Sequence, residues 1–416
     1  MTATKDRKHI LISGAGIAGP ALALLLTRLG HKCTIVEKAP DFRESGQQID
    51  VAGEALKVLD CMDAREDCFK CRVEDDGIKF IYGPDEQVAA RFPASSNAGA
   101  LVKELEIMRP DLARVFYEET REDVQYVFDD YITDLEQQEG SVTVTFAKSA
   151  PRTFDLLVAA DGLRSKTRTL AFGEDNTEIV GFNLFAAYFS IPWQESDGSW
   201  SRWYNAPGGR CVTVRPNITK GLTSAYLCQV TPDAAYVCGL SPEERNRELH
   251  SRFKDAGFEA PRILKYLNGP EGEDLYIQEA AQSKCQRLVK GRAVLMGDAG
   301  YCPSPFSGQG SSLALIGAYI LAGCIATHDD LDEALAEYEK TVRPFVTAAQ
   351  KLPPGVPWIV NPQTATGITI MNQLLKVADK VVNWGVAGAV GRLVSPVFSW
   401  VGTSEPTLPE YPQLNR

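Results

Sequence analysis

Three glycines near the N-terminus have the spacing of a turn that holds phosphate groups. Gly14, Gly16 and Gly19 form a G-x-G-x-x-G sequence between the apolar runs 9–13 and 20–29. In such a strand–turn–helix unit the first glycine permits a tight turn and the second lets the backbone approach a pyrophosphate. The third lets the helix pack closely on the strand, and the phosphates lie at the positive end of that helix. The pattern predicts a dinucleotide-binding unit.

A second short apolar run ends in Glu37, at the spacing where a carboxylate accepts hydrogen bonds from ribose hydroxyls. A carboxylate there suits a free 2′-hydroxyl, so FAD and NAD both fit and NADP fits less well. The same region resembles a secretory signal, because Lys5, Arg7 and Lys8 precede it. However, the glycines interrupt the apolar run and no small-residue cleavage site follows, so we expect a cytoplasmic protein.

Two later segments decide between FAD and NAD. Asp161 and Gly162 follow one apolar strand-like run, and Gly297 and Asp298 follow another. A carboxylate at a strand end, followed by a glycine turn into a helix, suits a ribityl hydroxyl and the edge of a flavin. The residues of a further turn, whose backbone could approach the isoalloxazine pyrimidine ring, are Pro305, Gly308 and Gly310. These segments favour FAD.

The three motifs, in this order and spacing, resemble the single-component FAD-dependent aromatic monooxygenases related to para-hydroxybenzoate hydroxylase. The resemblance spans about residues 8–345. It implies an α/β fold with a glutathione-reductase-like Rossmann FAD domain, an inserted β-sheet substrate domain and a C-terminal helical segment. It also implies that NADPH or NADH reduces the FAD transiently, since the sequence has no second G-x-G-x-x-G for a resident nicotinamide.

Two further segments, 43–50 and 106–112, are similar to the tetracycline-inactivating members and their secondary-metabolite relatives. By that resemblance Arg109 contacts FAD, Asp50 lies near the flavin, and Arg43 interacts with the nucleotide or the isoalloxazine ring. The alternative for these residues is a charge on the solvated surface.

The resemblance implies a monooxygenase that uses NAD(P)H and O2 to hydroxylate or otherwise oxygenate a polycyclic aromatic or polyketide-like small molecule. The oxygen is expected to pass through a flavin C4a-hydroperoxide, so the flavin does the chemistry and no catalytic residue is nominated. Strand position and the tetracycline-inactivating relatives together suggest the substrate residues Phe185, Arg202, Tyr204, Thr213 and Phe306. Arg202 could pair with an anionic or enolic substrate oxygen, although simple packing is the alternative for each of the five.

Two other functions remain open. A flavin reductase of the same fold could act on an isoprenoid lipid, and would turn over without O2. A non-catalytic flavin-bearing protein could sequester a ligand, and would bind it without stimulating NADPH oxidation.

The motifs require a discontinuous chain organisation. The cofactor domain is expected over residues 1–72, 101–176 and 281–345. The substrate domain is expected over 73–100 and 177–280, which are rich in β-branched and aromatic residues with turn signals between them. The stretch 181–191 alternates, with Phe185 on one face and Tyr188 on the other. A C-terminal helical region is expected over 346–416.

Composition limits the remaining function classes. The chain has 43 Lys and Arg against 54 Asp and Glu, so its net charge of −11 disfavours nucleic acid and anionic membranes as partners. With four histidines and a lone C-x-x-C at Cys68 and Cys71, no metal site is expected. The apolar run 381–401 contains Arg392 and Pro396, so we expect a packed helix there, with a monotopic membrane contact as the alternative. The partners expected are O2 and a small-molecule substrate, and the chain is expected to be a monomer or weak dimer.

Overall fold

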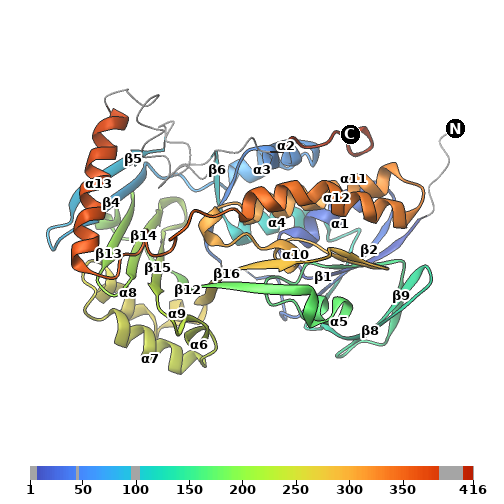
Figure 1. Cartoon of the computed structure of the whole chain (residues 1–416), viewed down its shortest axis with the longest axis horizontal. Helices are drawn as coiled ribbons and strands as arrows, with labels where there is room; N and C mark the ends of the chain where they lie inside the picture. The colour runs from blue at the N-terminus through green and yellow to red at the C-terminus, as the bar shows by residue number, and fades with distance from the viewer. Residues whose placement is uncertain (1–6, 44–45, 95–103, 384–405, 416) are drawn as a thin grey trace.

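The computed structural model describes residues 7–43, 46–94, 104–383 and 406–415. Its elements form two cores that lie end to end, with a layered α/β unit at one end and a large sheet with its own helices at the other (Figure 1). The α/β unit contains both chain ends.

The first core is built on a six-stranded sheet with the order β17-β18-β11-β1-β2-β7. Its strands are β1 (His9–Ser13), β2 (Lys32–Glu37), β7 (Gln125–Phe128), β11 (Leu156–Ala159), β17 (Val289–Lys290) and β18 (Ala293–Leu295). All neighbours except β17 and β18 pair in parallel. Parallel strands are covered on both faces, which explains their continuous apolar runs.

Helices cover one face of this sheet. They are α1 (Ala18–Arg28), α2 (Glu54–Cys61), α3 (Arg65–Lys70), α4 (Arg109–Thr120), α11 (Gly310–Thr327) and α12 (Leu331–Gln350). Ile10 and Ile12 of β1 pack among them in the larger apolar cluster. On the other face Leu11, Val36 and Leu157 pack against a three-stranded sheet. Its strands are β8 (Ile132–Gln138), β9 (Ser141–Phe146) and β10 (Arg152–Phe154).

The second core is a seven-stranded sheet with the order β16-β12-β15-β14-β13-β4-β5. Its strands are β4 (Gly77–Tyr82), β5 (Gln87–Pro93), β12 (Thr177–Pro192), β13 (Ser201–Ala206), β14 (Arg210–Asn217), β15 (Leu222–Val230) and β16 (Tyr276–Cys285). The helices on one of its faces are α6 (Ala234–Cys238), α7 (Pro242–Phe253), α8 (Ala260–Tyr266) and α9 (Pro270–Glu273).

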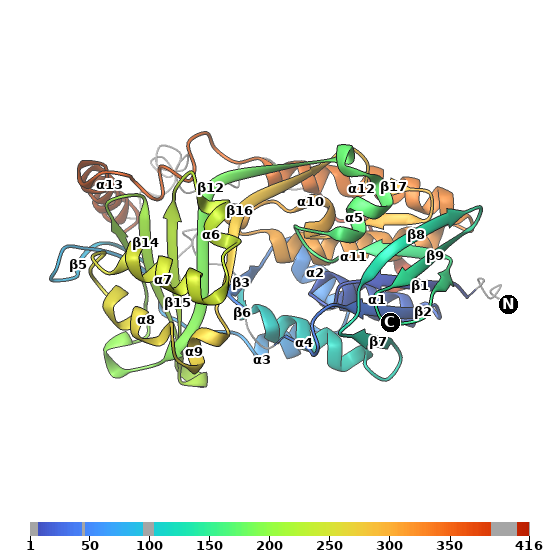
Figure 2. The same cartoon turned by 90° about the horizontal axis from the view of Figure 1, so that it is seen from below.

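Two connections join the cores. The long strands β12 and β16 pair from Thr177 and Cys285 beside the first core to Tyr188 and Tyr276 in the second, and Figure 2 shows them spanning the junction. A short antiparallel ribbon of β3 (Gln48–Val51) and β6 (Leu105–Met108) lies between the cores. Two further short helices are α5 (Lys166–Phe172), which lies beside β8, and α10 (Asp298–Tyr301), which contacts β16 and β18. The expected α/β fold class, a Rossmann domain with an inserted sheet, is confirmed.

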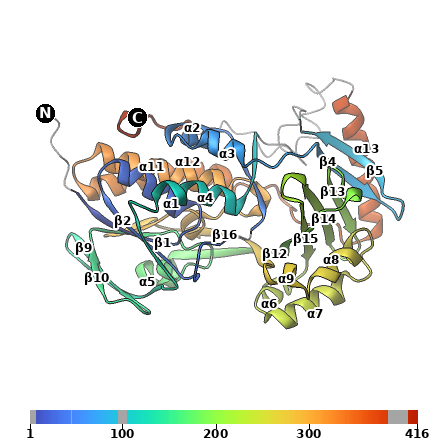
Figure 3. The same ribbon diagram turned by 180° about the vertical axis from the view of Figure 1, so that it is seen from behind.

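The expected helical region over 346–416 is only partly helical. Helix α13 (Ala365–Asn383) covers β4 and β5, whereas most of the apolar run 381–401 lies outside the described residues. Residues 406–411 are non-helical and only a 3-10 turn, Pro412–Leu414, follows, because Pro406, Pro409 and Pro412 lack the N–H groups that a helix requires. This tail packs on the first core, beside α2 and α11 (Figure 3).

One helix in the described part of the chain, α11, is long and apolar enough by composition to cross a membrane. Most of it is buried inside the first core, where Leu315, Ile320 and Leu321 have no exposed surface.

Candidate cofactor and substrate site

The first glycine turn has the geometry that its spacing predicts. Gly14 has φ +110°, and a Cβ there would lie 2.5 Å from the Ala160 carbonyl oxygen. A Cβ on Gly19 would lie 2.1 Å from the Gly14 carbonyl oxygen, so a side chain would force α1 away from β1. A Cβ on Gly16 would meet only the Arg109 guanidinium, with Nη2 at 3.3 Å. The turn is thus bare backbone with a cation beside it, which suits a pyrophosphate.

Glu37 lies at the edge of this turn. Its carboxylate accepts hydrogen bonds from the backbone N–H groups of Ala15 and Ala39, both at 2.9 Å. Arg43 Nη2 is 3.8 Å from Glu37 Oε1, and the Arg43 side chain is half-exposed. The spacing therefore brings an acid and a second cation to the phosphate turn.

The second motif lies against the first, and its carboxylate, Asp161, makes its hydrogen bonds within the motif. Asp161 accepts hydrogen bonds from the side chains of Ser165 and Thr167 and from the Thr167 N–H, which holds the start of α5. Gly162 provides the left-handed turn, with φ +88°. The buried Arg168 guanidinium donates to the carbonyls of Leu163 at 3.0 Å and Ala299 at 2.7 Å, and so ties this motif to the third.

The third motif completes the cradle. Gly297 has φ +59°, and a Cβ there would lie 3.2 Å from the Ala18 side chain of α1. The next residue, Asp298, has Oδ1 3.9 Å from the Cβ position of Gly310. A Cβ on Gly308 would lie 3.7 Å from Asp50 Oδ2. The turn that begins at Pro305 therefore lies between two carboxylates that the sequence separates by about 250 residues.

Protein surrounds the Asp298 carboxyl closely. This burial raises the pKa of Asp298, and the positive charge of Arg109 opposes the shift. Asp298 is nonetheless exposed to solvent. Tyr276 is exposed nearby: the protein around its phenol raises its pKa, and the charges of Arg109 and Arg43 oppose this. These residues form a surface, here called the cofactor region, where the first core meets β16, an edge strand of the large sheet.

These residues fit FAD. The glycine turns leave backbone exposed for the pyrophosphate, and Arg43 and Arg109 supply charge to neutralise it. In the adjacent segment the buried Oε1 of Gln47 and both side-chain polar atoms of Gln48 have no hydrogen-bond partner within the described residues. Buried polar atoms without partners are costly, and a ligand with donors and acceptors would satisfy them.

A row of mostly aromatic side chains crosses one face of the large sheet, starting at the cofactor region. Strand register aligns Tyr276, Tyr188, Tyr226, Thr213 and Trp203 on five neighbouring strands. The Tyr188 ring lies 6.4 Å from Tyr276 and 4.9 Å from Tyr226, centroid to centroid. Of the residues predicted from the sequence, Thr213 belongs to this row, where it is buried. Phe306 makes an edge-to-face contact with Phe182 at 5.9 Å in the cluster beside it.

The structure places three of the predicted substrate residues on the opposite face. Phe185 is fully buried against Phe253 of α7, with ring centroids 6.5 Å apart. Tyr204 stacks on Phe258 at 5.4 Å. Both lie in the apolar cluster between the sheet and its helices. Both therefore face α7 and α8 rather than the tyrosine row, and their assignment to the substrate pocket stays a prediction.

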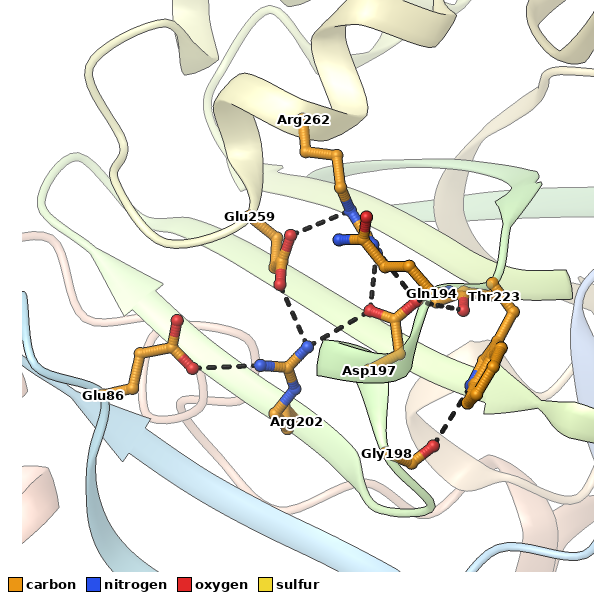
Figure 4. Close-up of polar contacts among 9 residues, drawn as sticks. Glu86, Gln194, Asp197, Gly198, Arg202, Thr223, Glu259 and Arg262 are labelled. Carbon is orange, nitrogen blue, oxygen red and sulfur yellow. Dashed lines mark hydrogen bonds and ion pairs between the residues drawn. The ribbon is translucent and has the colours of Figure 1, made fainter.

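Arg202 is also on the helix-covered face, where carboxylates surround it (Figure 4). Its guanidinium lies 3.0 Å from Glu86, 3.0 Å from Glu259 and 3.3 Å from Asp197. Asp197 is fully buried and also accepts two hydrogen bonds from Arg262. Arg202 is thus paired with protein carboxylates on the face away from the tyrosine row, and its pairing with a substrate oxygen stays a prediction.

Arg215 occupies the position that sequence reasoning gave to Arg202. It forms an ion pair with Glu106 and a hydrogen bond with the Tyr226 hydroxyl, which also accepts the Gln48 N–H at 3.2 Å. Burial raises the pKa of Tyr226, and the Arg215 charge opposes the shift. Strand alternation alone offers no signal for this pair, since it defines two faces without identifying the one that meets the cofactor domain.

Comparison with known proteins agrees with this geometry. A family model described as an FAD binding domain matches residues 7–352. The FAD-dependent monooxygenase asL6 of Sarocladium schorii is 32% identical, over 97% of this chain and 98% of its own. The flavin-dependent monooxygenase eupH of Phoma sp is 34% identical, over 82% of this chain and 84% of its own. Among solved structures, tetracycline destructase Tet(55) is similar with a TM-score of 0.77 and 27% identity, over 99% of this chain and 100% of its own.

Proposed function

The chain belongs to the FAD binding domain family of flavin-dependent monooxygenases, and from this membership we propose that it uses NAD(P)H and O2 to oxygenate a polycyclic aromatic or polyketide-like small molecule. The observation that supports this substrate class is the aromatic row Tyr276–Tyr188–Tyr226. The row begins in the cofactor region, beside Asp298 and Arg109. A planar, ring-rich molecule matches such a surface in shape and polarity.

The cofactor's contribution is separate from that of the chain. FAD, once reduced by a nicotinamide, supplies the activation of dioxygen. Arg109 and Arg43 would hold the phosphates of bound FAD, and Asp298, Gly308 and Gly310 would lie beside its flavin. The chain's remaining task is to place the substrate carbon against the flavin and to exclude water.

Arg215 and Tyr226 give the aromatic surface one polar end. Their hydrogen bond and the ion pair of Arg215 with Glu106 fix the guanidinium at the junction of the cores. A cation held there favours a substrate that presents a phenolic or enolic oxygen, because its charge stabilises the deprotonated form. Deprotonation makes the neighbouring carbon more electron-rich and so more reactive toward electrophilic oxygen. The similarity to Tet(55), a tetracycline destructase, supports this choice.

The proposal is tested with purified protein, NADH or NADPH, and a panel of phenolic and enolic polycyclic compounds. Stopped-flow absorbance follows flavin reduction, and mass spectrometry follows the product. The expected result is a compound that accelerates reduction and leaves with one added oxygen atom. Turnover without O2 would instead indicate the flavin reductase. Tight binding with no stimulated nicotinamide oxidation would indicate the ligand-sequestering protein.

A further inference from the structure

The C-terminal tail returns to the cofactor domain after the chain has left it. Helix α13 packs on β5 of the large sheet, and the next described residues, 406–415, lie against α2 and α11 of the first core. In Figure 1 the dark red end of the chain lies beside these two helices, far from α13. The tail therefore packs on two helices of the first core, although the helix that precedes it packs on the second.

Three apolar side chains anchor the tail at a regular spacing. Leu408, Tyr411 and Leu414 follow a Leu-x-x-Tyr-x-x-Leu pattern, and all three pack into the larger apolar cluster. Tyr411 is 8% exposed and Leu414 5%. This burial shows that the segment is held by side-chain packing on the first core.

The groove that receives Tyr411 is shaped for its ring. A Cβ on Gly323 of α11 would lie 2.1 Å from Cδ2 of Tyr411, so only glycine allows the ring to reach the helix backbone. Tyr319, one turn earlier, contacts the ring at a centroid distance of 5.3 Å. Glycine inside a helix is less favourable than alanine. The tyrosine ring supplies a reason for glycine at this position.

Polar contacts hold both helices through the same peptide. The Leu408 N–H donates to Glu54 Oε2 of α2 at 3.2 Å, and Cys61 Sγ of α2 donates to the Leu414 carbonyl at 3.4 Å. The Tyr411 N–H donates to the Tyr319 hydroxyl of α11 at 3.3 Å. The tail thus fastens α2 to α11.

These helices also carry the flavin end of the cradle. α2 begins three residues after Val51, and α11 begins at Gly310. Between them the Ala52 N–H donates to Ser312 Oγ at 3.2 Å, and Asp50 lies beside Gly308. A change in the packing of α2 on α11 therefore alters the spacing of Asp50 from Gly308 and Gly310.

We propose that residues 406–415 are a detachable clasp: a peptide that binds a preformed groove on α2 and α11 through Leu408, Tyr411 and Leu414, and whose seating sets how tightly FAD is held. The groove recognises a Leu-x-x-Tyr-x-x-Leu peptide, in this chain or added separately. This inference rests on the proposal that the chain binds FAD, but not on the identity of the substrate.

The first experiment removes the clasp and returns it. Deletion of residues 406–416 should weaken FAD binding about tenfold, which corresponds to about 1.4 kcal/mol, measured by titrating apoprotein with FAD. A synthetic peptide of residues 406–416 should bind the shortened protein and restore FAD affinity, whereas the same peptide with Tyr411→Ala should not. Unchanged FAD affinity on deletion, or a peptide that does not bind, would overturn the proposal.

The second experiment needs no truncation. It compares the direction of the Tm change that one substitution causes in two backgrounds. In the full chain Gly323→Ala should lower Tm and FAD affinity, because the new methyl group displaces the Tyr411 ring. In a Tyr411→Ala background the same change should leave Tm unchanged or raise it, since alanine then fits and favours the helix. An equal loss in both backgrounds would show that Gly323 serves another purpose and would refute the clasp.

Discussion

The guanidinium of Arg109 lies against Gly16, with Nη2 3.3 Å from the position of a Cβ on that glycine. Arg109 is the first residue of α4, and its charge also acts on Asp298. One side chain therefore connects the phosphate turn to the flavin end of the cradle.

Replacing Arg109 should weaken cofactor binding with little effect on folding. Arg109→Ala removes charge-assisted hydrogen bonds to FAD, worth about 1.5–3 kcal/mol, so the dissociation constant should rise by about ten- to a hundredfold. Titration of apoprotein with FAD, followed by flavin fluorescence, measures this. Arg121→Ala, an exposed arginine just after α4, is the matched control and should bind FAD normally. Equal FAD affinity in both variants would remove Arg109 from the site.

Gly19 should be intolerant of any side chain, since a Cβ would overlap the Gly14 carbonyl oxygen at 2.1 Å. Gly19→Ala should lower the free energy of unfolding by at least about 2 kcal/mol. Gly239→Ala is the control, because the nearest described atom to its Cβ would be the Tyr236 carbonyl oxygen, at 3.5 Å. Urea denaturation of both variants checks the difference. Similar stability for the two would mean that the close approach of α1 to β1 is not required.

Asp298 should make the apoprotein less stable as the pH rises. Burial raises its pKa in the folded chain, so the unfolded chain releases its proton first, from about pH 3.9 upward. Stability is therefore lost as pH rises from that value through the raised pKa. Asp298→Asn should flatten the dependence of apoprotein Tm on pH over this window. The same pH dependence in the variant as in the parent would contradict this.

The same carboxylate is expected to contact FAD. Asp298→Ala should lower the flavin content of the purified protein, read from the ratio of flavin to protein absorbance. Full flavin occupancy in this variant would contradict the assignment of Asp298 to the cofactor site.

Arg202 should matter for folding rather than for substrate. Arg202→Ala removes one of the two arginines that pair with the buried Asp197, which keeps its hydrogen bonds from Arg262, Thr223 and the Gln194 N–H. Loss of this charge-assisted contact should reduce stability by about 1.5–3 kcal/mol while KM stays near that of the parent. Chemical denaturation and steady-state kinetics on the folded variant separate the two effects. A large rise in KM with unchanged stability would restore Arg202 to the substrate pocket.

Tyr226 and Tyr204 form a matched pair on opposite faces of the sheet. Tyr226→Phe removes the hydroxyl that bonds Arg215 and Gln48, so substrate-stimulated turnover should fall about tenfold, with a stability change of about 1 kcal/mol. Tyr204→Phe keeps the ring stacked on Phe258 and should leave turnover unchanged. Equal turnover in the two variants would exclude the Arg215–Tyr226 pair from substrate handling.

The glycine turns could be predicted from the sequence because each is local. Gly14, Gly19 and Gly297 are fixed by backbone conformation or by contact with the next element, and those needs leave a pattern in the residue types. Glu37 and Asp298 follow because a parallel sheet brings the ends of its strands to one edge.

The substrate face could not be predicted in the same way. Alternation along β12 correctly separates Phe185 from Tyr188, but the face that meets the cofactor domain is decided by where α7 and α8 pack. The tyrosine row depends on the register of three strands that are distant in sequence, and Arg215 depends on Glu106 from the other core. These contacts are set by tertiary packing, which leaves no local pattern.

The source of the inserted oxygen tests the central claim most directly. With NAD(P)H and an accepted substrate, turnover under ¹⁸O₂ should give a product that contains one ¹⁸O atom, and turnover in H₂¹⁸O under ordinary O2 should give none beyond simple exchange. Product formed under argon, or product whose oxygen comes from water, would contradict assignment of the chain as a monooxygenase.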